Sequence, residues 1–70
     1  MNRDRNLING TQLRPGDLFA FRRLRSDACY LVVSVIKIDG ANVRVIALDG
    51  DCRIYRWIFT PWSVCWRLMH

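Results

Sequence analysis

Residues 29–57 read CYLVVSVIKIDGANVRVIALDGDCRIYRW and predict a three-stranded antiparallel meander. Two apolar runs and a third, mixed run are joined by Asp39-Gly40 and Asp49-Gly50. Asp-Gly between β-forming residues is a strong hairpin signal, because a two-residue type I′ turn needs positive φ at both central positions. The eight residues between the two turns make a middle strand of ordinary length.

Two-residue turns would fix the pairing register, and alternation then sorts the side chains into two faces. One face is mostly small, branched and apolar, and we expect it to be the core. It contains Val32, Ser34, Ile36, Val43, Val45, Ala47, Cys52, Ile54 and Arg56. Arg56 does not fit a core position, so we expect a bulge or a strand end there.

The opposite face of the meander is more apolar than a solvated sheet face would be. Its candidate interface residues are Leu31, Val33, Arg44, Ile46, Leu48, Arg53, Tyr55 and Trp57. A sharply bent second strand, buried on both sides, would explain the aliphatic members as well as an interface would. For the arginines and aromatic residues we favour a protein interface, because such residues dominate binding hot spots.

Outside the meander, residues 1–12 are polar and predict a flexible basic N-terminal arm, followed by a single domain over residues 13–70. Pro15-Gly16 predicts a type II turn, and a strand is expected over residues 17–23 with Phe19 on one face and Leu18 on the other. The loop after it carries three arginines that could bind phosphate or lie in solvent: Arg22, Arg23 and Arg25.

The Pro-Gly-Asp turn at residues 15–17, the loop, the meander and the segment TPWSV at residues 60–64 together resemble a Src-homology-3-like small barrel. The resemblance covers residues 13–68 and is architectural. It implies an all-β fold: a small five-stranded, strongly bent antiparallel sheet or barrel with a short single turn near residues 60–63. The acidic-aromatic signature of the peptide-binding members is missing, so recognition of proline-rich ligands is not implied.

Composition narrows the function classes. The 70 residues suffice for one domain, are 51% hydrophobic and carry a formal charge of +5. Ten of the eleven basic residues are arginine, and glutamate is absent. The lone histidine, His70, is terminal, so we expect no enzyme activity, no small-molecule substrate and no cofactor. Three cysteines, an odd number without a Cys-x-x-Cys pair, predict a cytoplasmic protein without a metal site. No apolar run is long enough to predict a membrane span.

Two functions remain open from the sequence. The first is a protein-interaction module or homo-oligomer, such as a small regulator of phage or mobile-element type, that uses the apolar face bordered by arginine and aromatic residues. The second is a nucleic-acid-binding barrel, in which the Arg22–Arg25 loop contacts phosphates and Tyr55 and Trp57 stack on bases. We rank protein interaction first, because the apolar excess is a stronger anomaly than the charge.

Overall fold

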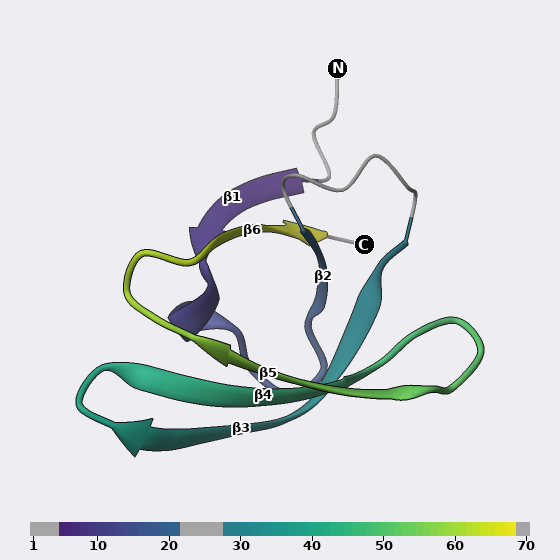
Figure 1. Ribbon diagram of the computed structural model, residues 1–70. Coiled ribbons are helices and arrows are strands. Elements are labelled where there is room, and N and C mark those ends of the chain that lie inside the picture. Colours follow the sequence, from purple (N-terminus) through teal and green to yellow (C-terminus); the bar gives the residue numbers. More distant parts are fainter. Residues whose placement is uncertain (1–4, 22–27, 69–70) are drawn as a thin grey trace.

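The chain folds as one antiparallel β-sheet, in agreement with the predicted all-β class (Figure 1). The computed structural model describes residues 5–21 and 28–68. Its elements are β1 (Arg5–Asn9), the 3-10 turn η1 (Gly10–Gln12), β2 (Leu18–Phe21), β3 (Tyr30–Asp39), β4 (Asn42–Leu48), β5 (Ile54–Phe59) and β6 (Val64–Leu68). The strand order is β1-β6-β2-β3-β4-β5, and the bent sheet does not close into a barrel.

The first strand corrects the expected N-terminal arm. Residues 5–9 pair antiparallel with β6 and residues 10–12 form η1, so both belong to the folded domain and the described sheet has six strands rather than five. The Asn9 side chain accepts a hydrogen bond from the Thr11 N–H at 3.0 Å, and the Gln12 side chain accepts one from the Asn9 N–H at 3.1 Å. The polar residues of this segment therefore cap a turn. Residues 1–4 lie outside the described residues.

The turn into β2 follows the prediction. Gly16 has a φ of +94°, which a type II turn requires at this position. The Asp17 N–H donates to the Arg14 carbonyl at 3.0 Å, and the Asp17 carboxylate accepts from the Arg14 N–H at 2.9 Å. In β2, Phe19 is fully buried while Leu18 lies on the other face, as the alternation predicts. The expected strand ends, within the described residues, at Phe21.

The β3–β4 hairpin forms with a different turn from the one expected. Asp39 pairs with Asn42, so Gly40 and Ala41 are the central residues, and only Gly40 has positive φ (+55°). That pattern is typical of a type II′ turn, which needs glycine at the first central position alone. Irregularities between Val32 and Ser34 and between residues 37 and 39 shift the register along the hairpin.

This shift preserves part of the expected core face and reverses the rest. Val32 pairs with Ala47 as predicted, and both are buried. Beyond the bulge, Val45 faces Val35 rather than Ser34. The expectation that Ile36 is a core residue is wrong, because its side chain is 50% exposed on the opposite face, and Ser34 lies on that face too.

The β4–β5 hairpin differs more. Its loop holds three residues between Asp49 and Arg53, and the Asp49 N–H donates to the Arg53 carbonyl at 3.1 Å. The Cys52 N–H donates to the Asp49 carbonyl at 3.0 Å, and Cys52 has a φ of +63°. A type I turn followed by a left-handed residue is the usual three-residue hairpin loop. Val45 therefore pairs with Trp57 instead of Ile54, a shift of three residues.

A shift by an odd number exchanges the two faces of β5. The core positions expected for Cys52, Ile54 and Arg56 are therefore wrong: all three are exposed. No bulge at Arg56 is needed to explain a charge there, since the side chain points away from the core. Tyr55, Trp57 and Phe59 occupy the inner face instead.

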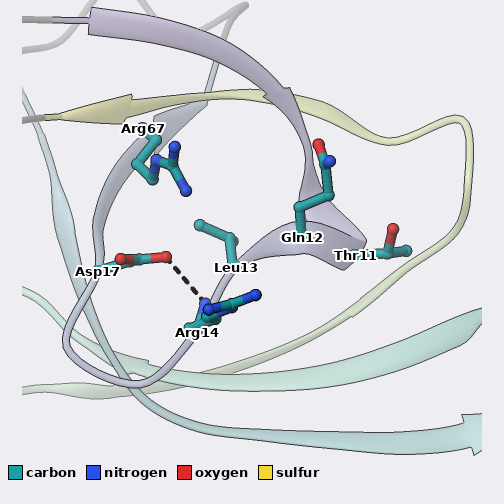
Figure 2. A pocket seen from close by; sticks show the side chains of 6 residues that line it. All are labelled: Thr11, Gln12, Leu13, Arg14, Asp17 and Arg67. Carbon is teal, nitrogen blue, oxygen red and sulfur yellow. Dashed lines mark hydrogen bonds between the residues drawn. The ribbon is translucent and has the colours of Figure 1, made fainter.

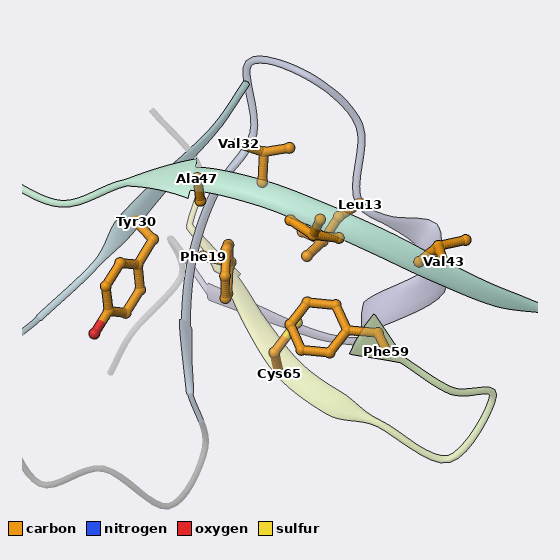
Figure 3. Packing of buried hydrophobic residues seen from close by; sticks show 9 residues of the cluster. Leu13, Phe19, Tyr30, Val32, Val43, Ala47, Phe59 and Cys65 are labelled. Atoms are coloured by element: carbon orange, nitrogen blue, oxygen red, sulfur yellow. The ribbon is translucent and has the colours of Figure 1, made fainter. Parts of the chain in front are cut away.

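The core lies on the concave side of the bent sheet (Figure 3). Its buried members are Leu13, Phe19, Tyr30, Val32, Val43, Val45, Ala47, Phe59 and Cys65. Phe19 and Phe59 meet edge to face, with ring centroids 5.8 Å apart, so β2 and the end of β5 pack across the hollow of the sheet.

The segment after β1 covers the end of β5, where the sheet is open. The Gly10 N–H donates to the Ser63 carbonyl at 2.7 Å, and the Asn9 side-chain amide donates to the Pro61 carbonyl. A Cβ on Gly10 would lie 2.7 Å from the Phe59 ring, so only glycine permits this approach. The predicted single turn near residues 60–63 is present, with the Ser63 N–H donating to the Thr60 carbonyl at 3.0 Å.

Candidate interaction surface

The convex side of the β3–β4–β5 meander is an aliphatic surface that holds two arginines. Three cross-strand rows form it, and we call these nine residues the outer face: Leu31, Leu48 and Ile54; Ser34, Ile46 and Arg56; Ile36, Arg44 and Ile58. Residues directly opposite in an antiparallel sheet project from the same side. Ile54 and Ile58 are 61% and 57% exposed, so the surface contacts solvent in this chain.

The first of these rows continues beyond the meander. Leu31 pairs with Leu18 on β2, and Leu18 pairs in turn with Leu68 on β6. Five aliphatic residues thus form one line across five strands: Leu68, Leu18, Leu31, Leu48 and Ile54. A convex face that is apolar along such a line differs from the polar outer face of an ordinary one-sided antiparallel sheet.

The structure separates the eight residues predicted to form an interface into three groups: outer-face residues, exposed residues at a bulge or loop, and inner-face residues. Leu31, Arg44, Ile46 and Leu48 lie on the outer face. Val33 is exposed at the bulge of β3, and Arg53 is exposed in the loop before β5.

Tyr55 and Trp57 are a correction, because they lie on the inner face with the core. Their rings are stacked, with centroids 5.2 Å apart and an interplanar angle of 6°. Trp57 also meets Phe21 and Tyr30 edge to face, each at 4.9 Å. These half-buried rings pack on each other, so the geometry offers the nucleic-acid hypothesis little free ring surface for bases. The phosphate-binding candidates Arg22, Arg23 and Arg25 lie outside the described residues.

Five outer-face residues were missed in the sequence analysis: Ser34, Ile36, Ile54, Arg56 and Ile58. Their displacement follows from the register of both hairpins. One sequence signal pointed to it, since an arginine at a position assigned to the core argues that the whole strand is assigned to the wrong face.

Asp49 fixes the loop that sets this register. Its carboxylate accepts hydrogen bonds from the N–H groups of Asp51 and Arg53, at 2.8 and 2.9 Å, and from the Tyr55 hydroxyl at 2.9 Å. The bond from the Arg53 N–H is the main cause that lowers the pKa of Asp49 below its usual 3.8. Donation to Asp49 raises the pKa of Tyr55, because the bond is lost when the hydroxyl ionises.

A polar pocket of about 530 Å³ lies between η1, the turn before β2 and β6 (Figure 2). It is lined by Thr11, Gln12, Leu13, Arg14, Asp17 and Arg67. Arg67 is directly opposite the buried Phe19, an inward position where a charge is unusual. The two guanidinium groups share the pocket with the Asp17 carboxylate, so its charge is mixed.

The described residues contain no group of three or more His, Cys, Asp or Glu side chains placed to hold a metal ion. Cys29 and Cys52 are exposed free thiols, whereas burial raises the pKa of the Cys65 thiol to about 11. The described part of the chain contains no helix with the length and hydrophobicity needed to cross a membrane.

Comparisons of this chain with protein-family models, with curated proteins and with solved structures found no match. The resemblance to Src-homology-3-like barrels therefore stays a prediction. What the chain itself defines is a small, open, strongly bent antiparallel sheet with an aliphatic convex face.

Proposed function

We propose that the protein is a non-catalytic interaction module that binds another protein through the outer face of its meander. The observation that carries this proposal is the pair of exposed isoleucines, Ile36 and Ile58, on the same face as the five-strand aliphatic row that ends at the exposed Ile54. The largest contiguous apolar patch on a soluble monomer is often a binding site. The aromatic core on the concave side already gives the sheet a buried face, so folding does not require the outer face to be apolar.

Affinity capture with a matched pair of variants tests the proposal. Ile58→Asp places a charge on the outer face at a side chain that is 57% exposed, so the fold should tolerate it. Trp62→Asp is the control, because Trp62 is 85% exposed in the turn at residues 60–63 and is not part of the outer face.

The wild-type protein and the Trp62→Asp variant should retain the same proteins from a nuclease-treated lysate of the source organism, and Ile58→Asp should lose them. Circular dichroism would first establish that both variants are folded. If Ile58→Asp retains the same set as the wild type, the outer face does not bind and the proposal is refuted.

A further inference from the structure

The two arginines of the outer face lie diagonal to each other. Arg44 pairs with Ile58, and Arg56 is two residues before Ile58 on the same strand and face. Diagonal neighbours in an antiparallel sheet have Cα atoms about 7–8 Å apart, within reach of each other's long side chains. Both side chains are exposed, and Ile36 and Ile46 are their direct partners on the neighbouring strands.

No acidic side chain of the described chain belongs to this surface. Asp17 lines the pocket, Asp39 is at the β3–β4 turn, and Asp49 and Asp51 are in the β4–β5 loop. Two guanidinium groups in an aliphatic surround repel each other, and bidentate contact with a carboxylate is the geometry they favour. Within the described residues no carboxylate neutralises this pair, so both guanidinium groups are open to a carboxylate of a partner.

The size of the outer face indicates what kind of molecule covers it. On β4 the outer face runs from Arg44 to Leu48, five residues that span about 17 Å, and three strands about 4.8 Å apart are roughly 10–14 Å wide. That footprint is well below the ~800 Å² that each partner buries in a standard interface between globular proteins. It matches one α-helix, which is about 10–12 Å in diameter and about 17 Å long over 11 residues.

A second copy of the chain fits this surface poorly. In a two-fold pairing of outer faces, each arginine pair would meet the aliphatic surface or the arginine pair of the other copy, because the face carries no carboxylate. Burying an unpaired guanidinium is strongly unfavourable.

We propose that the outer face binds a single acidic amphipathic segment of a partner protein, most simply a helix. Its apolar side chains contact Ile36, Ile46 and Ile58, and its carboxylates lie between Arg44 and Arg56. This inference rests on the proposed function and specifies the partner of the same site.

Selection from a random peptide library displayed against the folded full-length chain tests the inference. Enriched peptides of about 16 residues should combine Asp or Glu with apolar residues at helical spacing. The best peptide is then titrated by fluorescence anisotropy against the wild type, R44E/R56E and R14E/K37E. The last variant makes the same change in net charge at two exposed positions that are not on the outer face.

We expect R44E/R56E to lose at least about tenfold in affinity and R14E/K37E to change by less than about threefold. Replacing the acidic residues of the peptide with lysine should restore binding to R44E/R56E. Equal losses in the two variants, or enriched peptides without acidic residues, overturn the inference, as does a selection that enriches nothing.

Four outcomes separate this inference from the proposed function. If Ile58→Asp abolishes peptide binding but R44E/R56E does not, the docking face stands and the acidic partner is wrong. If neither affects binding, both fail. If sedimentation velocity shows a dimer that Ile58→Asp dissociates, the face binds a second copy. If the protein binds vesicles of phosphatidylcholine and phosphatidylglycerol and the peptide does not compete, the face binds a membrane surface. Either result overturns the inference.

Discussion

Gly10→Ala should destabilise the fold where η1 covers the end of β5. Gly10 is buried, and an added Cβ would lie 2.7 Å from Cγ and 2.8 Å from Cδ2 of the Phe59 ring. The ring cannot move away freely, because it is 6% exposed and its centroid lies 5.8 Å from that of Phe19. Forcing an extra methyl group into such a core costs about 1–3 kcal/mol.

In a domain of this size, each 1 kcal/mol lowers the melting temperature by roughly 4–8 °C, so the expected loss is at least about 4 °C. Thermal and urea unfolding followed by circular dichroism would measure it. Gly50→Ala is the matched control, because no atom lies within 4 Å of its added Cβ, and it should change stability by less than about 0.5 kcal/mol.

A double-mutant cycle tests the cause. Phe59→Ala removes Cγ and Cδ2, the two atoms nearest to the added methyl group, so Gly10→Ala should cost clearly less in the F59A background than in the wild type. The reasoning is refuted if Gly10→Ala and Gly50→Ala unfold at the same midpoint, or if the cost of Gly10→Ala does not depend on Phe59.

Three further predictions concern the β4–β5 loop and the thiols. The pKa of Asp49 is lowered in the folded state, so its carboxylate stabilises the fold above pH 3.8, and this contribution is lost as the pH falls through the folded pKa. The difference in unfolding free energy between wild type and Asp49→Asn, measured by urea unfolding, should therefore disappear in acid. Donation to Asp49 raises the pKa of Tyr55, so the contribution of this bond to stability is full below pH 10.0 and is lost as the pH rises through the folded pKa of Tyr55. Cys52→Gly should stabilise by about 1 kcal/mol in the same assay, since φ +63° is strained for a side chain; a loss would refute the loop geometry. At pH 8, iodoacetamide should modify Cys29 and Cys52 but spare Cys65 until the protein is unfolded; rapid labelling of all three in the native protein would contradict its burial.

The sequence was sufficient for the features that depend on local chemistry. Pro15-Gly16 predicts a turn because proline presets one φ and glycine supplies the other sign. The alternation in β2 places Phe19 inside, and the branched run of β4 places Val43 and Val45 inside. These assignments hold because each face is decided within a single strand.

The features that failed depend on long-range or side-chain-specific contacts. Three of the residues 5–9 are polar, and the strand they form is recognised only through its pairing with β6. Asp49 turns an apparent Asp-Gly hairpin into a three-residue loop, because its carboxylate binds two later backbone N–H groups, and Cys52 then takes a position that usually requires glycine. The residue pattern alone does not show that the Asp49 carboxylate makes these hydrogen bonds.

One loop residue therefore changes the character of the candidate surface. With a two-residue turn, the aromatic side chains of β5 would lie outside with Arg53, as on a stacking or hot-spot surface. With the longer loop, Tyr55 and Trp57 complete the aromatic core, and Ile54, Arg56 and Ile58 face outward. Arg56 then joins Arg44 on an aliphatic convex face, and the charge that appeared as a defect of the core becomes the feature that selects an acidic partner.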